Sequence, residues 1–365
     1  MVIIPKNITA ALKHVVYPGS KEDIVSLDMV QEIRIAGKKV AFSLVVQRSD
    51  DPNIPVLKKA CVAAIEEHVG NDVAIRGNIT VKAIHNMQVP VLPEVKNVIA
   101  VASGKGGVGK STMSVNLAVA LAATGAKVGL IDADIYGPSI PKMFGEEEGR
   151  PTGEKVSGRD LINPIEKFGV KILSIGFFVN QKDPLVWRGP MASNALKQLI
   201  VDGNWGKLDY LLIDLPPGTS DIHLSLVQTV PVTGAIIVST PQDIALADVV
   251  KGVGMFNSKS VDVPVLGIVE NMAWFTPAEL PENKYYIFGK EGAKKLAEEM
   301  GLPLLGQIPI VMSIREGSDE GVPAASRPDS VTGQAFAKLA NKVIEQVEYR
   351  NQNLKPTQKV KVSKK

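Results

Sequence analysis

Apolar residues follow two different patterns along the second part of the chain. From Val95 onward, short runs rich in Val, Ile and Leu alternate with segments of helical periodicity. Continuous apolar runs of this length are typical of strands buried on both faces, as in a parallel sheet covered by helices. We therefore expect an α/β fold with a mainly parallel, doubly wound sheet. The runs that predict strands are NVIAVASG (97–104), AKVGLIDAD (126–134), VKILSIGFF (170–178), DYLLIDLPPG (209–218), GAIIVSTP (234–241), PVLGIVEN (264–271) and PLLGQIPI (303–310).

The first part of the chain has its own pattern. ITAALKHV, EIRIAGKKVAFSLVVQ, NIPVLKKACVAAIEEHVG and DVAIRGNITVK predict a helix, a hairpin, a helix and a strand, which together make a small α/β domain over residues 1–85. NMQVPVLPEVKN, with two prolines and little periodicity, predicts a linker over 86–97. We expect the larger domain over 98–350 and a basic, flexible tail over 351–365.

The segment after the first buried run predicts a phosphate site. It reads VASGKGGVGKSTMSVNLA from Val101 to Ala118 and contains the spacing G-x-x-x-x-G-K-S. In such a loop, backbone N–H groups point at the phosphates and a lysine, here Lys110, neutralises them at the start of a helix. A glycine-rich turn without a ligand would not explain a lysine and a serine directly after the last glycine. The residues predicted to contact nucleotide are Gly104, Lys105, Gly106, Gly107, Val108, Gly109, Lys110, Ser111 and Thr112.

Acidic residues follow two of the predicted strands. Asp214 ends an apolar run and has the position of a carboxylate that holds Mg²⁺, with the hydroxyl of Ser111 as a direct ligand. Asp132 and Asp134 are two residues apart, so both can project from one face, one to orient an attacking water and one to brace the metal shell. The alternative is that these aspartates only cap turns, in which Asp is common.

Composition narrows the range of functions. A chain of 365 residues favours two domains, and a net charge of +3 gives no argument for nucleic acid. No apolar run has the length of a membrane span, and the N-terminus lacks the pattern of a secretory signal. The single cysteine, Cys61, excludes an intrachain disulfide and suits a reducing cytoplasm. We expect a cytoplasmic protein with no membrane partner.

Several motifs, taken in order, resemble one family. Lys105 directly after the first glycine gives GKGGVGKS, which resembles the deviant Walker A loop of the MinD/ParA superfamily of P-loop ATPases. More narrowly, the set resembles the Mrp/ApbC group of iron–sulfur cluster carrier ATPases over about residues 95–340, and the N-terminal module is similar to the small α/β domain of iron–sulfur assembly factors. The motifs are SGKGGVGKST, DADIYGPSIP, WRGPM, LLIDLPPGTSD, VSTPQDIALAD, GIVENMAWF and IREGSDEGVP.

The resemblance implies a mechanism and assigns roles. It implies an ATPase that uses ATP and Mg²⁺ as a homodimer, with Lys110 acting in its own subunit and Lys105 reaching the nucleotide of the partner. Asp134 matches the residue that orients the attacking water, Asp132 its acidic partner and Asp214 the Walker B acid. The second switch matches PPGTSD from Pro216. Asn271 matches the residue that reads adenine, with Pro241 and Gln242 close to the base, although an asparagine at a strand end is also an ordinary cap.

One departure from the family pattern concerns the cargo. The family's cluster-carrying members have a C-x-x-C pair after the ENM motif, whereas this chain has Thr276, Pro277, Ala278 and Glu279 there. Thiolates are the usual cluster ligands, so the conventional site is absent. Cys61 lies in a helical stretch with apolar neighbours and indicates a buried small hydrophobe, and His68 does not complete a metal site with it.

Two functions therefore stay open. The first is iron–sulfur cluster delivery to apoprotein clients or assembly proteins through a non-standard or partner-shared site. The second is a nucleotide-switched scaffold that recruits protein partners without a cluster. A spatial organiser of the MinD or ParA kind would need a membrane-binding amphipathic tail or a DNA-binding basic patch. The tail KPTQKVKVSKK has charge but no large apolar face, which disfavours the membrane version. The roles of Arg188 in WRGPM, of the N-terminal domain and of the tail are not indicated by the sequence.

Overall fold

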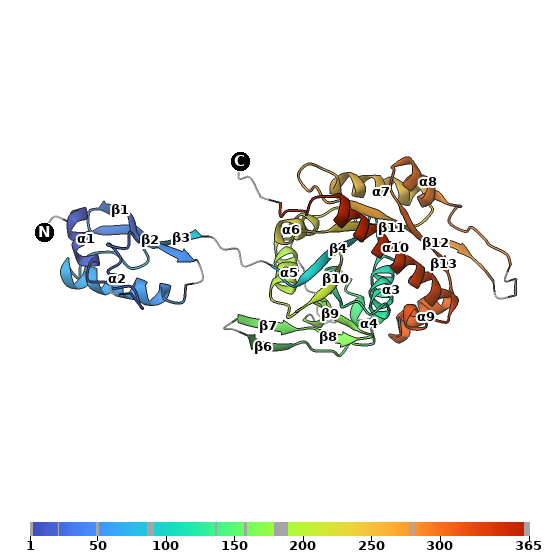
Figure 1. Cartoon of the computed structure of the whole chain (residues 1–365), viewed down its shortest axis with the longest axis horizontal. Coiled ribbons are helices and arrows are strands. Elements are labelled where there is room, and N and C mark those ends of the chain that lie inside the picture. Colours follow the sequence, from blue (N-terminus) through green and yellow to red (C-terminus); the bar gives the residue numbers. More distant parts are fainter. Residues whose placement is uncertain are drawn as a thin grey trace. The chain divides into compact units, whose positions relative to one another are not determined.

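The computed structural model describes residues 3–20, 22–48, 51–85, 91–135, 137–156, 159–178, 189–277, 279–280 and 282–360. The chain divides into two compact units, Met1–Val89 and Pro90–Lys365, which are described separately (Figure 1).

The N-terminal unit is a three-stranded sheet with two helices. Strand β2 lies in the centre, antiparallel to β1 and parallel to β3. Apolar side chains of both helices pack with those of β2 in one core, and the order of elements is the one the sequence predicted. The elements are α1 (Pro5–Leu12), β1 (Val30–Ala36), β2 (Lys39–Arg48), α2 (Ile54–His68) and β3 (Ile79–His85).

The C-terminal unit is built on an eight-stranded sheet. Its strand order is β13-β12-β11-β4-β10-β5-β9-β8, and every neighbouring pair is parallel except β8 with β9. This confirms the predicted mainly parallel α/β fold. The elements are β4 (Val95–Ser103), α3 (Lys110–Ala123), β5 (Val128–Asp132), α4 (Ile140–Met143), β6 (Thr152–Val156), β7 (Arg159–Asn163), β8 (Ile165–Lys167), β9 (Val170–Ser174), the 3-10 helix η1 (Ile175–Phe177), α5 (Gly189–Val201), β10 (Leu208–Asp214), α6 (Asp221–Thr229), β11 (Gly234–Ser239), α7 (Asp243–Phe256), β12 (Val265–Phe275), α8 (Gly292–Glu299), β13 (Leu304–Ile310), α9 (Met312–Glu320), η2 (Ala324–Ser326) and α10 (Val331–Asn353).

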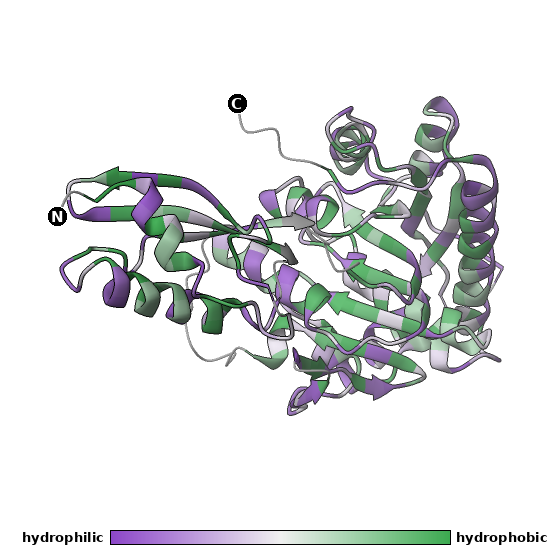
Figure 2. Ribbon diagram, turned by 60° about the vertical axis from the view of Figure 1, so that its left-hand side comes forward, coloured by the Kyte–Doolittle hydropathy of each residue, from purple (hydrophilic) through white to green (hydrophobic). Residues whose placement is uncertain are grey.

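Helices cover both faces of this sheet. Along β4, Val98 and Ala100 belong to one core, which also contains residues of α5, α6, α7 and α8. Ile99 and Val101 belong to the other core, with residues of α3, α4 and α10 (Figure 1). Because side chains alternate along a strand, a strand covered on both faces must be apolar throughout, and the sheet's strands are mostly green in Figure 2.

Two boundaries differ from the sequence prediction. Strand β4 begins at Val95, inside the predicted linker, because Val95 pairs with Leu208 of β10. Helix α10 continues to Asn353, beyond the predicted start of the tail at 351. The following residues make contacts of their own, since the backbone N–H of Val360 donates to the carbonyl of Val227. These differences arise from pairings between residues far apart in the sequence.

No helix in the described part of the chain combines the length and apolar composition needed to cross a membrane.

Candidate functional site

The glycine-rich loop connects β4 to α3 at the carboxyl edge of the sheet. Gly107 and Gly109 both have φ of +82°, in the left-handed region that favours glycine. Gly104 is fixed by space, because a Cβ there would lie 2.5 Å from the backbone carbon of Asp248 on α7. Helix α3 begins at Lys110, directly after Gly109. The loop therefore leads into a helix N-terminus, where backbone N–H groups and the helix dipole favour an anion.

Lys110 and Asp214 form the centre of the site. The Lys110 ammonium donates to Oδ2 of Asp214 at 2.8 Å, and both side chains are buried. The hydroxyl of Ser111 donates to the same oxygen at 2.6 Å, and that of Ser114 donates to Oδ1 at 2.6 Å. The loop and the end of β10 are thus joined by one hydrogen-bonded group.

Asp132 lies on β5, next to the end of β10. Its side chain is fully buried and accepts hydrogen bonds from the hydroxyl of Ser174 at 2.9 Å and from the backbone N–H groups of Asp134 and Ile140. Burial, together with the nearby charge of Asp214, raises the pKa of Asp132 to about 7. At neutral pH this carboxyl therefore titrates between its protonated and ionised forms.

Asp134 approaches the same lysine. Its Oδ2 lies 3.9 Å from the Lys110 ammonium, and its side chain is mostly buried. The structure thus brings Lys110, Ser111, Asp134 and Asp214 together, with Asp132 beside them. Lys105 is half-buried, and within the described residues its side chain makes no hydrogen bond or ion pair with its own chain.

The predicted second switch, PPGTSD, packs against the glycine-rich loop. The backbone N–H of Gly218 donates to the carbonyl of Ser103 at 2.9 Å. Ser220 then caps helix α6, and its backbone N–H donates to Nδ1 of His223 at 3.2 Å. Burial lowers the pKa of His223 to about 4, so its ring is neutral. Hydrogen bonds therefore link the switch to the end of β4 and to the first turn of α6.

Asn271 lies at the other side of the loop. Its Nδ2 donates to the carbonyl of Val108 at 2.8 Å, and a Cβ on Gly109 would lie 2.3 Å from that nitrogen. The contact places Asn271 directly beneath the loop, next to the predicted nucleotide positions.

Sequence reasoning missed the neighbour of Asn271. Glu270 is fully buried, and its Oε2 accepts from the backbone N–H of Ala293 at 2.7 Å, at the start of α8. Its Oε1 accepts from the side chain of Gln307 at 2.7 Å. A carboxylate near a helix N-terminus is stabilised by the helix dipole. The available signal was a glutamate directly after the apolar run from Val265 to Val269.

The potential thiolate ligand is out of reach. Cys61 has no exposed surface, and burial raises the pKa of its thiol to about 12. His68 is exposed and stacks on His14, with ring centroids 4.2 Å apart. Across the described ranges, no group of three or more His, Cys, Asp or Glu side chains has the arrangement of a metal site. Arg188 of the WRGPM motif and Ala278 lie outside the described residues.

The sequence of the chain matches two known family models. Residues 94–344 match the sequence model of the ParA family described as NUBPL iron-transfer P-loop NTPase. The chain belongs to this iron-transfer P-loop NTPase family. Residues 5–76 match the family described as iron–sulfur cluster assembly protein. The resemblance drawn from the motifs is confirmed for both parts of this iron-transfer NTPase.

The chain is also similar to individual proteins, in sequence and in fold. Over 340 residues the chain is 40% identical to an iron–sulfur cluster carrier protein of Synechocystis, covering 92% of this chain and 96% of the relative. Its fold is similar to that of a nucleotide-binding protein in complex with ADP from Archaeoglobus fulgidus, with 37% identity, a TM-score of 0.57 and coverage of 67% of this chain and 94% of the other. It is also similar to the cell division ATPase MinD of Pyrococcus furiosus, with 27% identity, a TM-score of 0.50 and coverage of 68% and 98%.

Proposed function

We propose that the protein is an ATP-hydrolysing, nucleotide-switched homodimer that acts in iron–sulfur cluster delivery. The observation that carries the proposal is the convergence of Lys110, Ser111, Asp134 and Asp214 at the N-terminus of α3. An ammonium, a hydroxyl and two carboxylates at a helix N-terminus are the groups that phosphoryl transfer from a nucleotide requires.

Lys110 is the proposed phosphate ligand. Its ammonium is buried and held by Asp214, so its charge is already directed to the helix N-terminus. Binding of ATP lets Lys110 exchange part of its contact with Asp214 for phosphate oxygens. Asp134, 3.9 Å from the lysine, accepts a hydrogen bond from the attacking water and orients it. Asn271 contacts the adenine, and Pro241 and Gln242 of the VSTPQDIALAD motif lie close to the base.

The donor set of the site suits Mg²⁺. Ser111, Asp214 and Asp132 offer only oxygen atoms, the ligands that this ion prefers, and they lie at adjoining strand and helix ends. When bound, the ion would neutralise charge on the phosphate oxygens. The protein's own part is to hold these oxygens in place through Ser114 and Ser174.

Lys105 is proposed to act on the partner's nucleotide. Within the described residues its side chain has no hydrogen bond or ion pair, which is consistent with a contact made only in a dimer. A cation supplied to a transferring phosphoryl group from another subunit is worth on the order of 10³ to 10⁵ in rate. Closure of the dimer would then be coupled to ATP, and hydrolysis would relax the PPGTSD segment that touches the loop through Gly218.

This chain differs from the cluster-carrying members of its family in the residues that are available to bind a cluster. Its only cysteine is buried with a pKa raised to about 12, so it does not supply the thiolate that a cluster needs. We therefore propose that the thiolates come from the client or assembly partner and that this chain contributes the nucleotide switch. The second candidate, a scaffold that never contacts a cluster, is favoured by the same absence of accessible thiols.

Anaerobic reconstitution with iron and sulfide separates these two candidates. We would measure iron bound per chain and visible absorption for the wild type and Cys61→Ser, each with and without glutathione as a thiol donor. Delivery with partner thiolates predicts bound iron only with glutathione, equally in both variants. A scaffold predicts no bound iron in either condition. Iron binding that is lost in Cys61→Ser would contradict both.

A further inference from the structure

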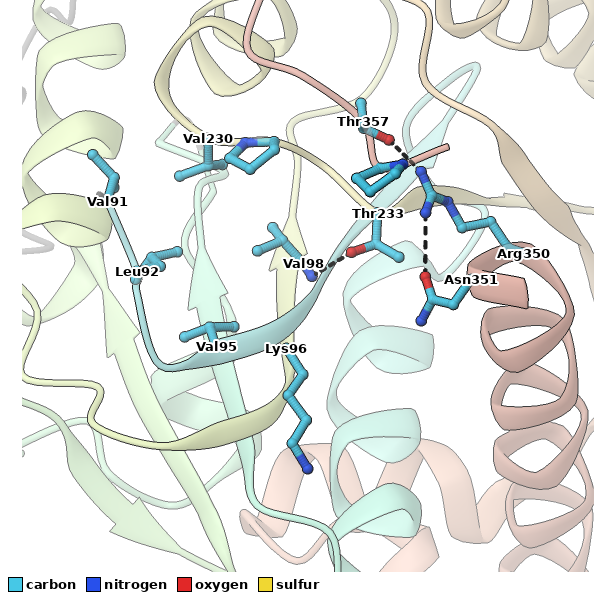
Figure 3. A pocket seen from close by; sticks show the side chains of 12 residues that line it. Val91, Leu92, Val95, Lys96, Val98, Val230, Thr233, Arg350, Asn351 and Thr357 are labelled. Carbon is cyan, nitrogen blue, oxygen red and sulfur yellow. Dashed lines mark hydrogen bonds between the residues drawn. The ribbon is translucent and has the colours of Figure 1, made fainter. Parts of the chain in front are cut away.

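A cavity lies in the C-terminal unit, at the end of the sheet opposite the glycine-rich loop. It has a volume of about 350 Å³, within the range of small-ligand sites. Figure 3 shows the cavity between the start of β4, the segment after α6 and the end of α10. Its walls are mostly valine, leucine and proline side chains, and their polar members are Lys96, Thr233, Arg350, Asn351 and Thr357.

Arg350 is the unusual member of this set. Its side chain is only 6% exposed, and within the described residues no carboxylate lies within ion-pair distance. Its guanidinium donates only to neutral acceptors: Oδ1 of Asn351 at 3.2 Å, the carbonyl of Lys355 at 2.9 Å and the hydroxyl of Thr357 at 2.7 Å. Its buried Nε has no hydrogen-bond partner at all in the described part of the chain. A buried charge is costly unless it is paired, so an anion bound in the cavity would stabilise this guanidinium.

The nearby acidic groups do not fill that role. Asp209, beside the cavity's rim, is ion-paired with the Lys96 ammonium at 2.8 Å and accepts from the backbone N–H of Lys127. In Figure 3 the Lys96 side chain points away from Arg350. Asp262 lines a neighbouring cavity that Arg350 also borders, but no ion pair joins the two. The carbonyls at the end of α10 offset part of the charge, as helix C-termini do, without supplying a full negative charge.

The other residues that line the cavity indicate which chemical groups a bound anion would have beside its charge. Except for Lys96 at the rim, the lining beside Arg350 contains no other charged side chain, and most of it is valine, leucine and proline. Thr233 also lines the cavity, and its hydroxyl oxygen accepts from the backbone N–H of Val98 at 3.0 Å. In the described part of the chain the Nε–H group of Arg350 is without a partner, so it can donate one charge-assisted hydrogen bond to an oxygen of a monoanion such as a carboxylate.

We propose that this cavity binds a small organic carboxylate with a short aliphatic body, with Arg350 on the carboxylate and the valines and prolines on the chain. The alternative is that Arg350 only fastens the segment from Lys355 to Thr357 to the end of α10. That reading requires no ligand and predicts no selectivity among small molecules.

The test uses the full-length chain without nucleotide and hexanoate as the probe, with hexan-1-ol and hexylamine as uncharged and cationic analogues. Binding is followed by saturation-transfer NMR titration. We expect hexanoate to bind at least tenfold more tightly than either analogue. Arg350→Gln should weaken hexanoate at least tenfold, and Arg150→Gln, at an exposed arginine, should leave it unchanged.

A second variant guards against loss of folding in Arg350→Gln. Val95→Phe places a larger side chain on the cavity wall and retains Arg350, and it should also weaken hexanoate at least tenfold. The proposal is overturned if hexanoate does not bind, if hexan-1-ol binds equally well, or if the affinity is unchanged in Val95→Phe or in folded Arg350→Gln.

Discussion

Asp132 and Asp214 occupy paired positions on the neighbouring parallel strands β5 and β10. Both are fully buried, yet only Asp214 is joined to the Lys110 ammonium. A buried carboxylate beside a second one is harder to ionise, because burial disfavours its charge and the neighbouring charge repels it. Burial and the neighbouring charge of Asp214 therefore leave Asp132 with a pKa raised to about 7.

This raised pKa predicts a pH dependence of stability. The pKa of Asp132 is raised from 3.8 to about 7, so between these values the folded state holds a proton that the unfolded state has lost. Stability from this group is present at acidic pH and is lost as the pH rises to about 7. Compared with Asp132→Asn, the wild type should lose about 3 kcal/mol of unfolding free energy between pH 5 and pH 8. Urea unfolding of both proteins across that range measures the difference, and a flat difference curve would refute the assignment.

Removal of Asp214 should destabilise the fold strongly. Asp214→Ala removes the carboxylate 2.8 Å from the buried Lys110 ammonium and leaves it the more distant Asp134 at 3.9 Å, which costs about 3–5 kcal/mol. Ser114→Ala is the matched control, because it removes one hydrogen bond to the same carboxylate and should cost about 1 kcal/mol. Chemical denaturation compares the two, and equal losses would show that the ion pair does not stabilise the site.

Replacement of Lys105 should affect hydrolysis and assembly together. Lys105→Ala removes the cation proposed to act in the partner's site, so ATP turnover should fall on the order of 10³-fold and the ATP-dependent dimer should be lost. Lys207→Ala, at an exposed lysine outside the site, serves as the control. Turnover is measured with ATP and Mg²⁺, and mass by light scattering. A wild type that hydrolyses ATP at full rate as a monomer would exclude the action in trans.

The parts of the fold that depend on local pattern were predictable from the sequence. Buried strands such as β10 are continuous apolar runs, and Lys110 and Asp214 follow directly from their motifs. Strand β8, with three residues, is too short to show periodicity, and the β6–β7 hairpin is largely exposed, so neither produces an apolar signal.

Other features depend on contacts between distant residues. The buried position of Glu270 depends on contacts with α8 and β13, and the chain after α10 contacts Arg350 through Lys355 and Thr357. The raised pKa of Asp132 requires the pairing of two strands more than 70 residues apart. Charge and hydrogen bonding of this kind are properties of the assembled sheet, so sequence pattern does not reveal them.

The central claim is that Lys110 binds the nucleotide and Asp134 enables its hydrolysis. The most direct test measures ATP binding and single-turnover hydrolysis in parallel for the wild type, Lys110→Ala and Asp134→Ala. We predict that Lys110→Ala loses ATP binding, whereas Asp134→Ala binds ATP with affinity close to that of the wild type and does not hydrolyse it. Wild-type ATP affinity in Lys110→Ala, or wild-type hydrolysis in Asp134→Ala, would contradict the account.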